Sequence, residues 1–551
     1  TPANAGTTFA LTTVTDTLAK NTGGSGDDDF VGAMTFTLDA LASSATLTAG
    51  DTMSGGAGID TLTVTVTGSA VTNTGEIATP TLMGVERVHV RSFENELNSR
   101  AGARAEIQED SVEMDLSNAD TALTEIGTTS SSSVESDVVF ANVSTLANVV
   151  MAGKGDLRVE YTAAPVTGTA DSISLTLNDV GTSATARSAF NANGVETVSV
   201  VSSGAANFLS LEAGAYTTVN ASGTQALTIE VQDTDVTVFD ASTATGAVTA
   251  DLSAIANANL TSVIGGTGST DTVTLGGAAV SVTAATNGLS KFSGFETLGV
   301  DTAHGITLSA DTSGITSFNL TQDLVQTLTL NTGYTGATSV DVTGSNAGDT
   351  VANSANVALT VAAGMTDLDS TITLTGGTGT DVLNATVDGA TITVDATVTN
   401  FETINVLSAT TAGTDGGLTM DDANVATTKA MTVDASTLAS GEVFTFTAAA
   451  ETDGAYTVIG GAGADDLTGG GGIDTITGGA GNDTIDGGAG DDILAGGAGV
   501  DSITTGAGDD TVTGGAGNDT IIVAANLTAS DTIDGGEGTD VLQLTSVSSA
   551  A

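Results

Sequence analysis

The feature that most constrains this chain is a run of seven consecutive nine-residue units between residues 460 and 522. Each unit follows the pattern Gly-Gly-x-Gly-x-Asp-x-apolar-x, and Thr505 is the only departure at the first position. The aspartates of the seven units are Asp465, Asp474, Asp483, Asp492, Asp501, Asp510 and Asp519. The apolar residues are Leu467, Ile476, Ile485, Leu494, Ile503, Val512 and Ile521. Seven matches in unbroken register are a very specific signal of a stacked repeat.

The residue types of the unit suit calcium. Glycine at the first, second and fourth positions permits left-handed backbone angles and lets carbonyl groups approach closely. Aspartate supplies a hard carboxylate oxygen, and turn carbonyls supply the rest of the roughly six to eight oxygen ligands of calcium. The last three residues form a short strand with an inward apolar side chain, so two units make one flattened coil. We expect one edge of the coils to stack Asp465, Asp483, Asp501 and Asp519, and the other to stack Asp474, Asp492 and Asp510.

Electrostatics makes this stack depend on calcium. Adjacent carboxylates about 5 Å apart repel by roughly 3 kcal/mol at an effective dielectric constant of about 20. One apolar residue in each unit cannot offset that repulsion together with the entropy of ordering the backbone. Extracellular modules bind calcium with dissociation constants on the order of 10⁻⁴–10⁻³ M, so cytosolic calcium leaves such sites empty. The segment is therefore predicted to fold outside the cell, with multiple calcium ions as its cofactor.

Isolated copies of the glycine-aspartate motif lie outside the run. They place further candidate calcium ligands at Asp27, Asp60, Asp271, Asp381 and Asp540. The copy at Asp271 carries one extra residue before its aspartate. A lone copy can be a tight turn between strands or a single-ion site, and the sequence leaves both open. Asp60 and Asp381 are the stronger candidates because strand-like residues follow them.

A fainter repeat marks the region before the run. Four segments share an apolar-Glu-x-apolar-x-Val pattern, and their glutamates are Glu86, Glu196, Glu296 and Glu402. We therefore expect about four related β units over residues 1–455, followed by a calcium-binding roll over 456–545. Below, "the roll" means residues 456–545.

Composition sets the fold class. Thr, Ala, Gly, Val and Ser dominate, which favours short strands broken by turns and predicts an all-β protein of stacked solenoid or sandwich-like units. A chain of 551 residues is too long for one core. It has no cysteine, which excludes disulfides and thiolate metal sites, and no apolar run long enough for a transmembrane segment. The net charge of −56 would repel nucleic acid and attract cations.

One segment departs from the β pattern. Residues 87–104 hold four of the ten basic residues, and Glu96 and Arg100 lie at helical spacing. We expect a short helix or ordered insertion there. Its charges form either a solvated, salt-bridged face or a docking patch for anionic polysaccharide or an acidic neighbouring subunit.

No enzymatic constellation is evident. A zinc protease would need His-Glu-x-x-His, whereas the two histidines, His89 and His304, are far apart. The lipase motif Gly-x-Ser-x-Gly is not found. Carboxylates are so frequent that no pair is diagnostic of glycoside chemistry. We expect a protein that is not an enzyme.

The run from Gly460 to Ile522 resembles the RTX calcium β-roll of proteins exported by type I secretion. That resemblance implies a parallel β-roll with calcium between successive turns. The rest of the chain, with phrases such as Phe295-Glu296-Thr297-Leu298 and Val433-Asp434-Ala435-Ser436, resembles the calcium-dependent surface-layer (S-layer) proteins of Gram-negative bacteria. Such proteins form a homo-oligomeric two-dimensional lattice at the cell surface, anchored to lipopolysaccharide. The alternative is a calcium-dependent secreted adhesin with repeated β domains.

Overall fold

The computed structural model describes most of the chain after residue 138 and shorter segments before it. The described residues are 8–10, 17–19, 29–36, 52–54, 58–68, 75–77, 80–94, 112–129, 138–256, 259–268, 270–276, 281–282, 292–300, 305–308, 315–320, 327–330, 338–343, 349–355, 357–364, 368, 372–387, 389–408, 416–523 and 527–545. These residues form strands, turns and loops, and none of them forms a helix that could cross a membrane.

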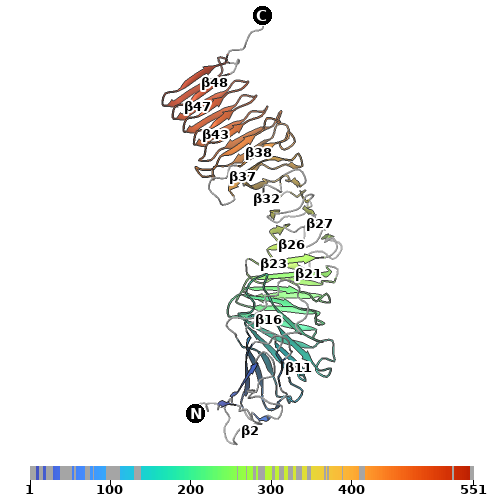
Figure 1. Cartoon of the computed structure of the whole chain (residues 1–551). Coiled ribbons are helices and arrows are strands. Elements are labelled where there is room, and N and C mark those ends of the chain that lie inside the picture. Colours follow the sequence, from blue (N-terminus) through green and yellow to red (C-terminus); the bar gives the residue numbers. More distant parts are fainter. Residues whose placement is uncertain are drawn as a thin grey trace, which may run out of the picture. The chain divides into compact units, whose positions relative to one another are not determined.

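The chain divides into two compact units. The first comprises residues 1–277 and 291–296, and the second comprises residues 278–290 and 297–551. Within each unit the chain winds as a solenoid, so that each strand pairs in parallel with the equivalent strand of the next coil (Figure 1). The predicted all-β fold is confirmed, and the parallel pairing makes it a solenoid rather than a sandwich. The division of residues 1–455 into four related units stays a prediction.

Three sheets run through the first unit. One sheet contains, in order, β1 (Thr8–Ala10), β3 (Asp29–Phe36), β5 (Thr61–Gly68), β8 (Arg87–Glu94), β10 (Glu125–Thr128), β12 (Asn148–Ala152), β14 (Ser172–Asn178), β16 (Thr197–Ser203), β18 (Thr218–Gly223), β20 (Val238–Ala244), β22 (Ser262–Ile264) and β25 (Phe292–Ser293). A second contains β6 (Gly75–Ile77), β9 (Val112–Asp115), β11 (Val138–Val143), β13 (Leu157–Tyr161), β15 (Ser188–Ala192), β17 (Asn207–Leu211), β19 (Leu227–Val231), β21 (Val248–Ala256) and β23 (Thr272–Gly276). A third, smaller sheet contains β2 (Thr17–Ala19), β4 (Thr52–Ser54) and β7 (Thr81–Met83).

The second unit is built in the same way. Its longest sheet contains β26 (Thr297–Val300), β28 (Ser317–Asn319), β30 (Thr338–Asp341), β32 (Leu359–Gly364), β34 (Val382–Val387), β37 (Thr403–Ser408), β39 (Ala430–Asp434), β41 (Ala455–Ile459), β43 (Thr475–Ala480), β45 (Ile493–Ala498), β47 (Thr511–Ala516) and β49 (Thr532–Glu537). Facing strands belong first to a sheet of β24 (Ser281–Val282), β27 (Gly305–Leu308), β29 (Thr327–Leu330), β31 (Thr350–Asn353), β33 (Thr373–Thr375) and β36 (Val398–Thr399). They belong next to a sheet of β35 (Thr391–Val394), β38 (Gly416–Met420), β40 (Phe444–Thr447), β42 (Asp466–Thr468), β44 (Thr484–Asp486), β46 (Ser502–Thr504), β48 (Thr520–Val523) and β50 (Val541–Leu544).

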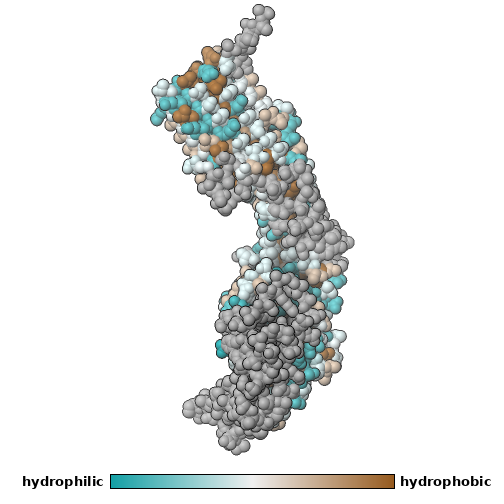
Figure 2. Space-filling view, in the orientation of Figure 1, coloured by the Kyte–Doolittle hydropathy of each residue, from teal (hydrophilic) through white to brown (hydrophobic). Residues whose placement is uncertain are grey.

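The core is a set of apolar rows that run from coil to coil. Parallel pairing in register places equivalent residues directly above one another, as for Leu467, Ile485 and Ile503 in the roll. These three side chains are fully buried. The row ends at Leu542, which pairs with Ile521 and is 52% exposed because no described coil covers it. Apolar patches are visible among hydrophilic surface in this part of the chain (Figure 2).

The short helix or ordered insertion expected over residues 87–104 is wrong for residues 87–94. These residues form strand β8, because apolar and charged residues alternate with a period of two. Val88 and Val90 are fully buried, whereas Arg87 and His89 lie on the outer face and contact Glu125 at 3.6 and 2.9 Å. This contact matches the salt-bridged face that the sequence left open. Residues 95–111 lie outside the described residues.

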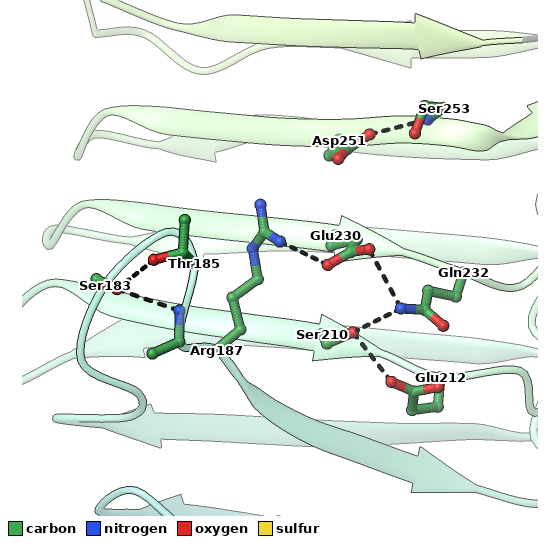
Figure 3. A network of polar contacts seen from close by, with 10 residues as sticks. Ser183, Thr185, Arg187, Ser210, Glu212, Glu230, Gln232, Asp251 and Ser253 are labelled. Atoms are coloured by element: carbon green, nitrogen blue, oxygen red, sulfur yellow. Dashed lines mark hydrogen bonds and ion pairs between the residues drawn. The ribbon is translucent and has the colours of Figure 1, made fainter. Parts of the chain in front are cut away.

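Polar side chains also join neighbouring coils on the outer face of the first unit. Arg187 reaches Glu230 of β19 across 2.6 Å, and Gln232, which follows the last residue of β19, donates to Ser210 of β17 at 3.3 Å (Figure 3). Ser210 in turn donates to Glu212 at 3.1 Å. Such side-chain bonds add to the backbone ladder between adjacent coils.

Candidate metal centre

Within the seven nonapeptide units, each coil of the roll consists of two strands and two glycine-rich turns. Strands β42, β44, β46 and β48 lie on one side, and β41, β43, β45 and β47 lie on the other. Paired residues of these units are eighteen positions apart, as in Asp466 with Thr484 and Thr475 with Ile493. The predicted eighteen-residue coil is therefore confirmed. The seven apolar residues of the units point inward and are each at most 2% exposed.

The aspartates form two ladders of hydrogen bonds. In each rung the Oδ1 atom of one aspartate accepts the backbone N–H of the aspartate one coil earlier. We call the edge that carries Asp465, Asp483, Asp501 and Asp519 the Asp483 edge, and the edge that carries Asp474, Asp492 and Asp510 the Asp492 edge. On the Asp483 edge, Asp465 donates to Asp483 at 2.8 Å, Asp483 to Asp501 at 2.9 Å and Asp501 to Asp519 at 2.9 Å. On the Asp492 edge, the N–H of Asp474 donates to Asp492 at 2.8 Å, and the N–H of Asp492 donates to Asp510 at 3.0 Å. The predicted arrangement of the seven aspartates in two rows is what the structure shows.

The second carboxylate oxygen distinguishes two kinds of rung. In the first rung of each edge, Oδ2 of Asp465 accepts the N–H of Gly461, and Oδ2 of Asp474 accepts that of Gly470, both at 2.7 Å. Further along the roll, four Oδ2 atoms are buried without a hydrogen-bond partner, and they belong to Asp483, Asp492, Asp501 and Asp519. A buried carboxylate oxygen with no partner is costly, and a bound cation removes that cost. These residues therefore fit calcium.

Burial governs the acidity of the ladder. Burial, together with the smaller effect of neighbouring aspartates, raises the pKa of Asp483 to about 6 and that of Asp492 to about 7. Hydrogen bonds from the backbone N–H groups of Asp465 and Asp474 oppose these increases. Burial also raises the pKa values of Asp465, Asp474, Asp501 and Asp510 above their ordinary range. Both effects penalise negative charge, which is the condition that favours a divalent cation.

Main-chain carbonyls line the same turns. Among the described residues no three acidic or histidine side chains gather into a metal site. Calcium bound in the roll must therefore draw most of its oxygen ligands from the backbone. Gly497 and Gly499 show how closely the turns stack, because their φ angles are +110° and +150° and an added Cβ would meet the carbonyl oxygens of Gly479 and Gly481. Only glycine fits at these positions.

The ladder continues past the seventh unit. The N–H of Asp519 donates to Oδ1 of Asp540 at 3.1 Å, which places the predicted Asp540 on the Asp483 edge. On the other edge the N–H of Asp510 donates to Oδ1 of Asp531 at 2.8 Å. The sequence analysis did not name Asp531, because its turn lacks the glycines. Its signal is the second half of the motif, Asp531-x-Ile533.

Upstream, the glutamates of the fainter repeat take the ladder position. Four aspartates each donate a backbone N–H to the Oε2 atom of a glutamate one coil later. The pairs are Asp60 with Glu86 at 2.7 Å, Asp171 with Glu196 at 2.9 Å, Asp271 with Glu296 at 2.7 Å and Asp381 with Glu402 at 2.7 Å. The glutamate N–H donates back to the aspartate carbonyl in each pair. We call each pair an Asp-Glu latch. Asp171 was missed because no glycine pair precedes it.

The upstream candidates differ in how their carboxylates are satisfied. Asp381 accepts the N–H groups of Leu359 and Gly377 at 2.7 and 2.6 Å, so it resembles the first rung of the roll. Asp271 accepts the N–H of Val248 at 2.7 Å through Oδ1, and its buried Oδ2 has no partner. Asp60 is fully buried, and Asp27 lies outside the described residues. Calcium binding by individual upstream aspartates stays a prediction.

Removing one latch should destabilise its coil. Glu402→Ala leaves the N–H of the fully buried Asp381 without its acceptor, which costs about 1–3 kcal/mol. Faster hydrogen exchange at the Asp381 amide and a lower unfolding midpoint would show this loss. Glu402→Gln keeps an acceptor oxygen and should behave nearly as the wild type. Equal exchange rates in the alanine variant and the wild type would contradict the role of the latch.

Comparison with known families agrees with this geometry. The model of the RTX calcium-binding nonapeptide repeat matches four stretches, residues 48–63, 459–494, 486–521 and 528–543. The first stretch includes Asp60, and the last includes Asp531 and Asp540. The comparison with curated proteins yields no match. RTX repeats are calcium-binding motifs that are typical of secreted proteins. The chain therefore carries multiple RTX calcium-binding repeats, and its parallel solenoid fits an RTX β-roll protein.

Proposed function

We propose that this protein is a structural subunit of a calcium-dependent bacterial surface layer, which assembles into a two-dimensional lattice outside the cell. The observation that carries the proposal is the pair of buried aspartate ladders in the roll, with four carboxylate oxygens that have no partner. Such a roll is poorly stable without calcium and well stabilised with it. Folding is then confined to a compartment with millimolar calcium.

The residues of the roll have distinct tasks in this proposal. Oδ1 atoms hold the register of successive coils, and the unpartnered Oδ2 atoms together with turn carbonyls hold calcium. Calcium bound there supplies the positive charge that the buried carboxylates lack. The carboxylates of Asp465 and Asp474 already accept two N–H donors each. The coil that contains them is therefore ordered without calcium, and the first calcium-binding coil stacks on it.

Assembly follows from the charge of the chain. With 66 acidic and 10 basic residues, two copies repel each other strongly at neutral pH. Screening by monovalent salt weakens this repulsion beyond about 8 Å, but it does not bridge two acidic faces. Calcium ions between neighbouring subunits would both weaken the repulsion and bridge the two acidic faces. Lipopolysaccharide or another surface polysaccharide is the anchor we propose, and no catalytic role is part of the proposal.

Electron microscopy of the purified protein tests this function. Ordered sheets that form with millimolar calcium and disappear with chelator are the expected result. Magnesium at the same concentration is the matched control, because it keeps the charge and the ionic strength. Particles that stay monomeric or filamentary in calcium, and that bind a surface receptor, would instead establish the secreted adhesin.

A further inference from the structure

The two edges of the roll are chemically unequal. On the Asp483 edge, Asp483, Asp501 and Asp519 follow one another, and each has a buried Oδ2 atom without a partner. On the Asp492 edge, among the described residues, Asp492 alone has such an atom. A row of equivalent nonapeptides would give both edges the same chemistry, so some residue on the Asp492 edge must change it.

Thr505 is that residue. It occupies the first position of its unit, where the other six units have glycine. In two other units, a Cβ added to Gly487 or Gly514 would lie 2.6 Å from the Oδ2 atom of that unit's own aspartate. Real Cβ atoms do not approach an oxygen so closely, so a threonine and an aspartate cannot share the arrangement of the other units.

The structure shows how the Thr505 unit resolves this conflict. Thr505 is 3% exposed, and its side chain lies close enough to the carboxylate of Asp510 to oppose the increase that burial causes in the pKa of that group. The Oδ1 atom of Asp510 still accepts the N–H of Asp492 at 3.0 Å, so the ladder itself is intact. The threonine side chain is thus a polar neighbour of Asp510 within its own turn.

The next rung on this edge offers no replacement. The turn before Asp531 is three residues longer than in the nonapeptide units, since Asp510 and Asp531 are 21 positions apart. The Oδ2 atom of Asp531 accepts the N–H of Thr528 at 2.6 Å. Beyond Asp492 on this edge, Asp510 therefore has the Thr505 side chain beside it, and Asp531 has a hydrogen-bond donor from within its own turn.

We infer that Thr505 removes one calcium position from the Asp492 edge, because its side chain fills the space beside Asp510 and its hydroxyl group takes the place of the cation. The Asp483 edge is then the continuous calcium ladder, and the Asp492 edge stops short. This inference rests on the proposed use of the aspartate ladders as calcium sites.

Calcium stoichiometry tests the inference. We compare the full-length wild type with Thr505→Gly by equilibrium dialysis with metal analysis, and with isothermal titration. Thr505→Gly restores the repeat pattern and should bind one more calcium ion per chain. Thr505→Ser keeps both the Cβ and the hydroxyl group, and should bind the same number as the wild type. Ions held elsewhere in the chain cancel in these differences.

A reciprocal variant makes the test independent of one substitution. Gly496→Thr introduces the same side chain beside Asp501 on the Asp483 edge, and should lose one calcium ion per chain. Unchanged stoichiometry in either Thr505→Gly or Gly496→Thr overturns the inference. A wild-type protein whose roll binds no calcium would instead refute the proposed ladder itself, so the two failures are distinguishable.

Discussion

The double variant Asp483→Ala, Asp501→Ala should fail to order its roll at millimolar calcium. Each substitution removes a carboxylate with an unpartnered buried oxygen, which is the candidate calcium ligand. Each also removes the acceptor for a backbone N–H, those of Asp465 and Asp483. A buried N–H that loses its acceptor costs about 1–3 kcal/mol, and the lost metal coordination adds to this. The two changes are consecutive on one edge, so the ladder breaks in its middle.

Calcium-induced circular dichroism and limited proteolysis would measure this effect. We expect the wild type to gain β signal and protease resistance with calcium, and the double variant to gain neither. Asp466→Ala with Asp534→Ala is the matched control, because it removes the same charge from exposed positions that do not belong to the ladder. An unchanged calcium response of the double ladder variant would refute the proposed role of these carboxylates.

In calcium-free buffer, the roll should be more stable in acid than at neutral pH. Burial raises the pKa of Asp483 to about 6 and that of Asp492 to about 7, from an ordinary value of 3.8. A carboxyl group with a higher pKa in the folded state binds protons more tightly there than in the unfolded chain. Its contribution to stability is fully present below about pH 4 and is lost as the pH rises through about 6 to 7.

A pH series of unfolding curves without calcium would test this expectation. The unfolding midpoint of the roll should decrease as the pH is raised from about 4 to about 7. At about pH 7, where the carboxylates are ionised and can bind the cation, added calcium should restore the midpoint. Asp483→Asn with Asp492→Asn removes both titrating groups and keeps an acceptor oxygen at each position. That variant should lose much of the pH dependence and much of the calcium response. A midpoint that rises with pH in the wild type, without calcium, would contradict the explanation.

The roll could be predicted from sequence because its spacing is fixed. Nine residues per unit carry the chain from one edge to the other, so the alternation of Asp483 and Asp492 between edges follows from counting alone. The second and fourth positions are also strict, since glycine is needed where carbonyls of adjacent coils meet. Burial of Ile485 and Leu494 follows from the same count.

The upstream ladder could not be predicted in the same way, because its coils vary in length. The aspartate and glutamate of a latch are 26 residues apart for Asp60 and Glu86, but 21 apart for Asp381 and Glu402. No fixed period links them, so Glu86 was recognised as part of a repeat but not as the partner of Asp60. The basic residues of 87–104 and the spacing of Glu96 and Arg100 predict a short helix or ordered insertion, whereas in residues 87–94 the alternating valines of β8 decide in favour of a strand.

The alternation of the roll between two edges also limits how its length can change. Loss or gain of a single nonapeptide would exchange the rows, so that every later aspartate would stand above a residue of the opposite row and every later strand would join the opposite sheet. An even number of units can be removed or inserted without this exchange. We therefore expect rolls of this kind to gain or lose nonapeptide units two at a time during evolution. This constraint comes from the two-unit coil rather than from any single residue.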